Sequence, residues 1–171
     1  EVERIISNWQ SAEPVSLFCD QGQVVFLAAH QVVTTRTLEG IYPNYKQLIP
    51  DQFSNKITLE RKSFVSALER VAILADQHNN VVKISCDHSL SKIEVSSEAQ
   101  DVGSCSESLS AEIQGENLQI AFNVRYILDG LKAIDSELIN LHFNSPTTPA
   151  IISPKNDNES FIYLIMPVQT R

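Results

Sequence analysis

The stretch Leu118–Asp135, LQIAFNVRYILDGLKAID, carries a strand pattern that runs directly into a helix pattern. LQIAF is short and largely apolar, which is typical of a buried strand. Asn123 follows as a good N-cap, because its side chain can accept a hydrogen bond from a first-turn N–H. The apolar residues of the helix recur at intervals of three and four, at Val124, Ile127, Leu128, Leu131 and Ile134. The stretch therefore predicts a strand followed by an amphipathic helix over 123–135.

The same unit occurs earlier in the chain. KITLE is typical of a strand, and RKSFVSALERVAILAD, residues 61–76, is typical of a helix. Its apolar stripe consists of Phe64, Val65, Leu68, Val71, Ala72 and Ala75. Three strand-like runs follow each helix: NVVKISCD, SKIEVSS and VGSCSESLSAEI after the first, and LINLHFN, PAIIS and SFIYLIMP after the second.

A shorter copy opens the chain. EVERIISNWQ is predicted as a helix, and PVSLFCD, QVVFLAA and VVTTRTLEG follow it as strands. A unit of one helix and three strands thus occurs three times. This repeat predicts an α+β protein, in which helix-plus-strands units place helices on one side and antiparallel sheets on the other.

The repeat also predicts where the domains divide. Residues 41–55, IYPNYKQLIPDQFSN, contain two prolines and polar spacers and are typical of an extended linker. The two later units together form a domain of about 115 residues, an ordinary size. The first copy is then half of another domain. The only methionine is Met166, so we expect the chain to be part of a longer protein.

The composition narrows the possible functions. A formal net charge of −8 argues against binding nucleic acid through a broad basic surface. Three widely spaced cysteines suggest neither a disulfide framework nor a zinc site, and favour a reducing, cytoplasmic setting. No run is long and apolar enough to span a bilayer. No nucleophile, phosphate or dinucleotide motif occurs, and the histidines lack ligand spacing. We expect no enzymatic activity, no metal and no cofactor.

The outer faces of the two longer helices carry the basic residues Lys62, Arg70, Arg125 and Lys132. Acidic residues on the same helices bring them near charge balance, in a chain that is acidic elsewhere. Ordinary ion pairs on a solvated face explain this pattern, and a helix layer turned toward a polyanion is the alternative.

Two apolar residues, Ile73 and Leu74, project away from the apolar stripe of the first long helix. Single exposed apolar residues are ordinary, whereas two adjacent ones at a helix end indicate a subunit contact. The end of the chain, ESFIYLIMPVQTR, raises a similar question. Chain termini are usually poorly ordered. An apolar tail is therefore unusual, and it is either buried or forms an edge that binds other apolar groups.

Three segments, TLEGIYPNYKQLIP, FNVRYILDGLKAI and YLIMPVQTR, resemble the bacterial sliding clamps, the beta subunits of replicative DNA polymerase III. The segments occur in the same order, and the resemblance covers the whole chain. It implies that residues 1–52 are the C-terminal half of the clamp's middle domain and that residues 53–171 are its complete C-terminal domain. It also implies a non-catalytic processivity factor for DNA replication, a ring-shaped homodimer that encircles duplex DNA with its helices lining the hole.

The resemblance further implies a hydrophobic cleft that binds short Gln/Leu/Phe motifs of polymerase subunits, the clamp loader and repair proteins. The residues that match it are Pro43, Leu48, Asn123, Tyr126, Thr147, Pro149, Leu164, Ile165, Met166, Pro167 and Val168. Ile73 and Leu74 match the contact between subunits. The ending Gln169–Thr170–Arg171 departs from the Arg-Leu that is usual in the family.

Two rival functions remain at this stage. One is a truncated, clamp-like peptide-binding module that acts without encircling DNA. The other is an enzyme built on the same repeat, which would need convergent polar groups in a pocket. The sequence shows no such groups.

Overall fold

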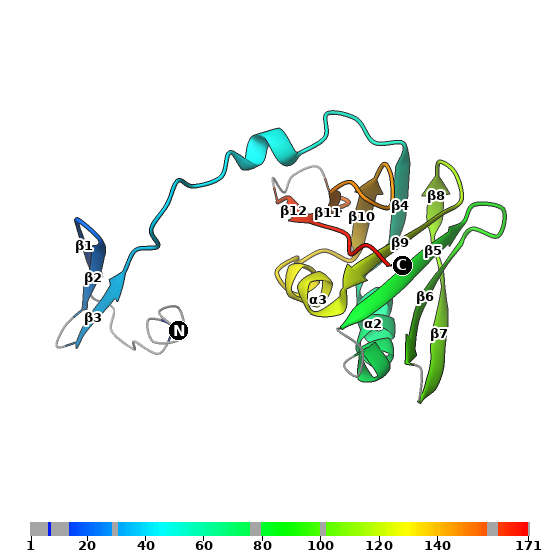
Figure 1. The fold of residues 1–171 in the computed structure, drawn as a ribbon, viewed down its shortest axis with the longest axis horizontal. Helices are drawn as coiled ribbons and strands as arrows, with labels where there is room; N and C mark the ends of the chain where they lie inside the picture. The colour runs from blue at the N-terminus through cyan, green and yellow to red at the C-terminus, as the bar shows by residue number, and fades with distance from the viewer. Residues whose placement is uncertain are drawn as a thin grey trace. The chain divides into compact units, whose positions relative to one another are not determined.

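The computed structural model describes residue 7 and residues 14–28, 31–75, 80–99, 102–156 and 161–170. The chain divides into two compact units, Glu1–Asn44 and Tyr45–Arg171. Figure 1 shows the strands of the first unit in blue and those of the second from cyan to red. The helix expected over residues 1–10 lies outside the described residues, apart from Ser7.

The first unit contains three antiparallel strands, β1 (Ser16–Asp20), β2 (Gln23–Ala28) and β3 (Gln31–Arg36). They confirm the three strands expected in this region. The β1–β2 turn is tight because Gly22 adopts φ +79°, a left-handed conformation that glycine accepts without steric cost.

The second unit contains two antiparallel sheets. The five-stranded sheet has the order β12-β11-β10-β4-β8, from Tyr163–Ile165, Ala150–Pro154, Leu138–Phe143, Asn55–Glu60 and Glu112–Gln114. The four-stranded sheet has the order β7-β6-β5-β9, from Gly103–Ser110, Lys92–Ala99, Val81–Asp87 and Leu118–Asn123. Side chains on β5 and β6 alternate between the core and the surface, as the period of a half-buried strand requires.

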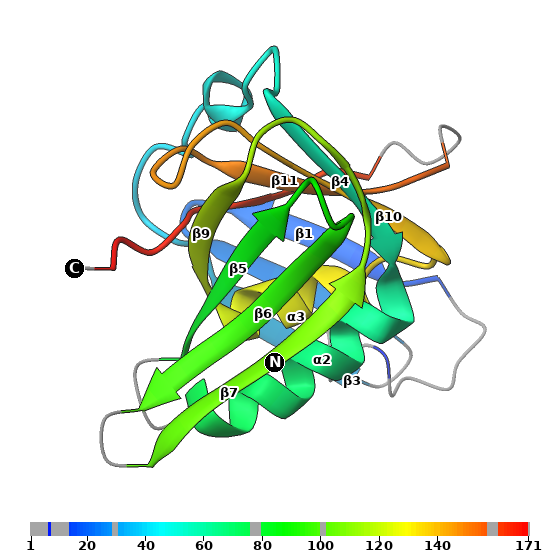
Figure 2. The same cartoon turned by 90° about the vertical axis from the view of Figure 1, so that its right-hand side faces the viewer.

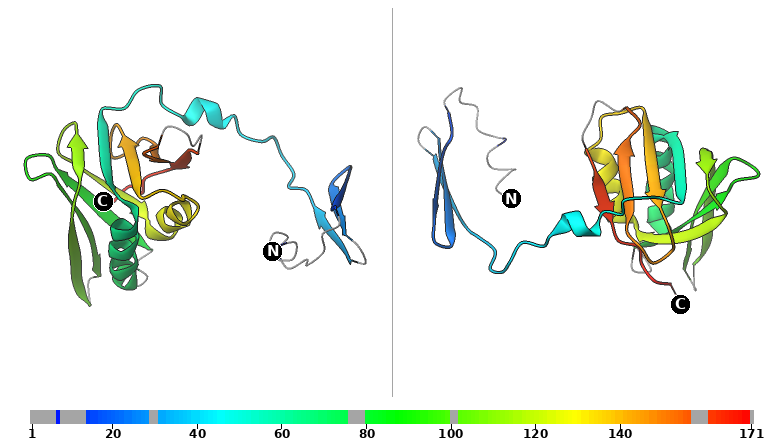
Figure 3. Two further views of the ribbon diagram at one scale, coloured as in Figure 1. Left: turned by 180° about the vertical axis from the view of Figure 1, so that it is seen from behind. Right: turned by 90° about the horizontal axis from the view of Figure 1, so that it is seen from above.

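Two helices, α2 (Arg61–Ala75) and α3 (Val124–Lys132), pack side by side against these sheets. Figure 2 shows α2 behind β6 and β7, and Figure 3 shows the same helices from two further directions. Phe64, Leu68 and Val71 of α2 are fully buried, and Ile127 and Leu131 of α3 meet them in one core. The α+β class is confirmed, and so is the helix-plus-strands repeat in the second unit.

Arg61 joins the two repeat units. Its backbone N–H donates to the Glu137 carbonyl over 2.9 Å. Its guanidinium donates to the carbonyls of Ser136 and Leu131, over 2.9 and 3.3 Å. A cation at these carbonyls complements the negative end of the α3 helix dipole. The start of α2 is thereby fixed to the end of α3.

Three segments differ in detail from their expected forms. The run VGSCSESLSAEI is split into β7 and β8, because the chain passes from one sheet to the other around the buried Ala111. The linker contains a 3-10 helix, η1 (Tyr45–Leu48). Of SFIYLIMP, only β12 is strand; Pro167 follows shortly after and cannot donate a ladder hydrogen bond.

Cys86 gives a test of this packing. Its side chain is 6% exposed, and burial raises the pKa of its thiol to about 12. At pH 8 only about one Cys86 in ten thousand is then a thiolate, the form that reacts. We expect Cys86 to resist iodoacetamide in the folded protein and to react on unfolding. Peptide mapping by mass spectrometry measures this, with the exposed Cys19 as the reactive control. Rapid alkylation of Cys86 under native conditions would contradict the core described here.

Candidate functional site

The start of α3 is held in place by its own capping residue. Asn123 ends β9, and its side-chain oxygen accepts a hydrogen bond from the Arg125 N–H over 3.0 Å. The Val124 N–H donates to the Asn80 carbonyl over 2.8 Å, which connects the helix start to the residue before β5. Tyr126, in the first turn, is 59% exposed. A well-capped helix therefore presents an aromatic ring at the surface.

The tail lies next to this helix start. β12 pairs with β11, so that Leu164 faces Ile151 and Ile165 faces Ala150. Beyond β12, the Val168 N–H donates to the Ala121 carbonyl over 2.8 Å. Because Ala121 belongs to β9 of the other sheet, the tail bridges the two sheets of the domain. This bond and the β11 pairing hold the apolar end of the chain in place.

A close contact between α3 and β12 fixes the spacing of the two elements. A Cβ atom added at Gly130 would lie 2.5 Å from Cε1 and 2.8 Å from Cγ of Tyr163, so the ring lies directly on the glycine. The Tyr163 hydroxyl donates to the Tyr126 carbonyl over 2.9 Å. Burial raises the pKa of Tyr163, which keeps this phenol protonated as a donor at neutral pH.

The arrangement leaves an apolar surface beside the tail. Ile165 is 4% exposed and anchors the strand, whereas the next residue, Met166, is 55% exposed. Tyr126 lies on the helix that Tyr163 ties to the same strand. Tyrosine and methionine both suit binding of apolar peptide side chains, since one offers a rigid ring with a polar tip and the other an adaptable thioether. We refer to Tyr126, Leu164, Met166 and Pro167 as the docking surface.

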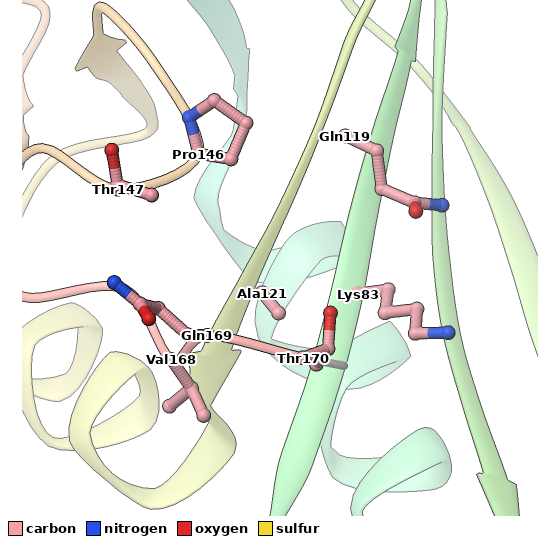
Figure 4. Close-up of a pocket in the computed structure, with 8 residues that line it drawn as sticks. All are labelled: Lys83, Gln119, Ala121, Pro146, Thr147, Val168, Gln169 and Thr170. Atoms are coloured by element: carbon pink, nitrogen blue, oxygen red, sulfur yellow. The ribbon is translucent and has the colours of Figure 1, made fainter.

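A turn and a small hollow adjoin the docking surface. In the turn between β10 and β11, the Ser145 N–H donates to the Thr148 hydroxyl over 3.1 Å. Thr147 of this turn and Val168 of the tail line a hollow of about 220 Å³. Figure 4 shows that hollow, with Pro146 and Thr147 on one side and the tail residues below them.

The predicted cleft residues are therefore only partly brought together. Asn123 and Tyr126 at the start of α3 lie next to the strand and tail residues from Leu164 to Val168. Pro43 belongs to the first unit, and Leu48 lies in η1 and is 49% exposed. Among the described residues, no hydrogen bond or strand pair connects Leu48 with the tail, so its role and that of Pro43 remain predictions.

The basic residues of the helices have different surroundings. Lys62 and Arg125 are exposed, and Lys132 of α3 lies 3.9 Å from Glu69 of α2. Arg70 instead forms a two-pronged ion pair with Glu107 of β7, with 2.6 Å between Nη2 and Oε2. The hydrogen bonds of this pair raise the pKa of Arg70 and lower that of Glu107. Arg70 is thus directed toward β7.

A second hollow, of about 630 Å³, lies beside this ion pair. Arg70, Ile73 and Leu74 of α2 line it together with residues 102–105 at the start of β7. Ile73 is 75% exposed. The sequence singled out Ile73 and Leu74, but it gave no indication that β7 lies beside them.

Sequence analysis missed three residues that shape the docking surface: Gly130, Tyr163 and Ala121. Gly130 carried a usable signal, because a glycine inside a helix pattern often marks a close approach of another element. Tyr163 and Ala121 carried none, since their roles depend on long-range packing.

The described residues offer no other obvious chemistry. They contain no group of three or more His, Cys, Asp or Glu side chains that could hold a metal ion. Within the same residues, no helix has the length and apolar character needed to cross a bilayer.

Comparison with known proteins agrees with this architecture. Residues 46–169 match the family described as "DNA polymerase III beta subunit, C-terminal domain". The chain is 46% identical to the beta sliding clamp of Synechococcus elongatus over 171 residues, which is all of this chain and 45% of that protein. It is 44% identical to the beta sliding clamp of a Synechocystis species, over 99% of this chain and 43% of that protein.

Solved structures show the same fold. The beta subunit of DNA polymerase III from Thermotoga maritima superimposes with a TM-score of 0.81 at 29% identity, over 99% of this chain and 45% of that one. The sliding clamp of Bacillus subtilis gives a TM-score of 0.79 at 35% identity, over 92% of this chain and 41% of that one. The chain thus spans less than half the length of the relatives it matches. It belongs to the DNA polymerase III beta subunit family, the bacterial sliding clamps.

Proposed function

We propose that this chain is part of a sliding clamp that encircles duplex DNA and docks its partners through the docking surface. The observation that carries the proposal is the exposure of Tyr126 and Met166 on elements fixed by the Tyr163–Tyr126 and Val168–Ala121 hydrogen bonds. A fixed apolar surface suits partners that offer a short apolar segment. We infer that these are polymerase subunits, the clamp loader and repair proteins, with Gln, Leu and Phe as anchors.

The clamp itself performs no catalysis in this account. A ring is retained on DNA because it is closed, so tight or sequence-specific contact with the duplex is not needed. This is compatible with a net charge of −8, because a few basic residues on the helices suffice to favour DNA inside the ring. Acidic sheets on the outside then discourage binding of DNA elsewhere.

The proposal is tested with the whole clamp subunit, which contains this chain together with the preceding domains found in its relatives. We expect it to be retained on nicked circular plasmid after loading by a clamp loader, and to slide off when the plasmid is linearised. Equal retention on both DNA forms would contradict encirclement. A subunit that binds peptide but is never retained on circular DNA would favour a peptide-binding module that acts without DNA.

Arg125→Glu combined with Lys132→Glu is expected to reduce retention on circular DNA roughly five- to tenfold, because two exposed cations of α3 become anions. Gel filtration of plasmid-bound clamp measures this. Peptide affinity is expected to stay unchanged. The matched control is Lys92→Glu with Lys155→Glu, the same charge change on β6 and on the residue after β11. Equal retention of the α3 variant and the wild type would contradict a DNA-facing role for Arg125 and Lys132.

Ile73→Asp is expected to weaken dimerisation of the whole subunit, roughly thirtyfold at each interface, because it replaces an exposed apolar side chain of the hollow beside β7 with a charged one. Sedimentation velocity measures the monomer fraction across a dilution series. Leu90→Asp is the control, since Leu90 is 64% exposed in the turn between β5 and β6. Unchanged dimerisation of the Ile73 variant would remove Ile73 from the subunit contact.

A further inference from the structure

The hollow between the tail and β5 extends beyond the docking surface. Thr147 and Val168 belong to the predicted cleft, whereas Lys83 of β5 and Gln119 of β9 do not. Figure 4 shows Thr170 of the tail beside Lys83, which lies on β5, the strand next to β9. The hollow therefore adjoins the docking surface at Val168, the residue after Pro167, and reaches across two strands of the four-stranded sheet.

Five of the eight residues that line this hollow are polar, and Ala121, Pro146 and Val168 are apolar. Lys83 carries its only charge. Gln169 and the two threonines can donate a hydrogen bond, whereas Gln119 already donates one to the Ser85 hydroxyl over 2.9 Å. No carboxylate lines it, although Asp and Glu outnumber Lys and Arg by 21 to 13 in the chain. A hollow with one cation, several donors and no anion suits a carboxylate.

The surroundings of Lys83 leave its ammonium available. Its direct cross-strand neighbours are Ser96 on β6 and Ala121 on β9, both uncharged. Glu94 and Glu98 are diagonal neighbours on β6, but among the described residues neither forms an ion pair with Lys83. A lysine ammonium on a flexible four-carbon stem can therefore turn toward a ligand in the hollow.

We propose that this hollow is an accessory subsite for an acidic side chain that flanks the apolar anchors of a docking segment. The inference rests on the proposed function, because the same segment must first occupy the docking surface. Because Val168 of the hollow directly follows Pro167 of the docking surface, one peptide can reach both places. Lys83 then adds a charge-based preference to a surface that otherwise recognises apolar groups.

Fluorescence anisotropy with the whole clamp subunit tests this subsite. The probes are labelled peptides with the same Gln, Leu and Phe anchors and with Glu, Gln or Lys at the flanking positions, before or after the anchors. We expect a Glu flank on one side to bind roughly three- to fivefold more tightly than a Gln flank, as for a partly exposed ion pair. The advantage should shrink as salt is raised.

Two variants show whether Lys83 is responsible. Lys83→Ala should abolish the advantage of the Glu flank and leave the Gln-flanked peptide unaffected. Lys83→Glu should reverse the order, so that the Lys flank binds best. Lys92→Glu is the matched control, because it makes the same charge change on β6 outside the hollow.

The outcomes distinguish failure of the accessory subsite from failure of the docking surface. Equal affinity for Glu and Gln flanks, or a Glu advantage that survives Lys83→Ala, overturns the subsite and leaves the docking surface intact. Failure of every peptide to bind a folded subunit overturns both.

Discussion

Tyr126→Ala combined with Met166→Ala is expected to weaken binding of a Gln/Leu/Phe peptide at least thirtyfold, roughly 2 kcal/mol, with little change in stability. Both side chains are more than half exposed, at 59% and 55%, so they contribute little to the core. Truncation removes an aromatic ring and a thioether from the docking surface. Anisotropy titration of the labelled peptide measures the loss, and circular dichroism confirms the fold.

A matched control for this pair is Leu90→Ala with Val102→Ala. These residues are 64% and 67% exposed and lie in turns, Leu90 between β5 and β6 and Val102 just before β7. Peptide affinity should be unchanged in the control. An affinity for the double variant within twofold of the wild type would contradict the assignment of Tyr126 and Met166 to the docking surface.

Gly130→Ala is expected to destabilise the protein by about 1–3 kcal/mol, the usual cost of forcing extra volume into a packed contact. The sign is informative, because glycine to alanine inside a helix is otherwise stabilising by about 1 kcal/mol. At this position the new methyl group would meet the Tyr163 ring 2.5 Å away at Cε1. Urea unfolding followed by circular dichroism measures the change in the free energy of unfolding.

The same substitution should also weaken peptide binding, because displacement of Tyr163 shifts β12 and the tail beyond it. A double-mutant cycle with Tyr163→Ala separates the steric clash with the ring from other effects of Gly130→Ala. Removal of the ring should relieve the destabilisation that Gly130→Ala causes. Asp129→Ala, an exposed substitution one residue away, serves as the control. A more stable Gly130→Ala protein would contradict the close contact between α3 and β12.

Local patterns were sufficient to predict both helices and most strands of the second unit. The spacing of Phe64, Leu68 and Val71 predicted α2, and these residues are fully buried in the structure. Asn123 was predicted as an N-cap, and its side chain accepts from the Arg125 N–H. Such features depend on neighbours within a few residues, so a single sequence contains them.

Features that depend on residues far apart in the chain were not predicted from the sequence pattern. The alternation in VGSCSESLSAEI continues through the change of sheet at Ala111, so nothing local marks the division into β7 and β8. The ion pair between Arg70 and Glu107 connects residues 37 positions apart. The approach of Tyr163 to Gly130 likewise follows from the packing of a C-terminal strand on an earlier helix.

The docking surface was likewise predicted only in part. Its apolar character was evident from the sequence of the tail, and its residues came from the resemblance to the sliding clamps. The way in which the tail is held was not evident. The Val168–Ala121 and Tyr163–Tyr126 hydrogen bonds, over 2.8 and 2.9 Å, join segments that lie far apart in the sequence.

The most direct test of the docking surface uses the single methionine of this chain, Met166. Labelling the methionine methyl group with ¹³C gives one resonance from Met166, identified by its loss in Met166→Leu. We predict that a Gln/Leu/Phe peptide shifts this resonance in a saturable way, whereas a scrambled peptide does not. A resonance that stays unchanged at peptide concentrations well above the dissociation constant would show that docking does not occur at the tail.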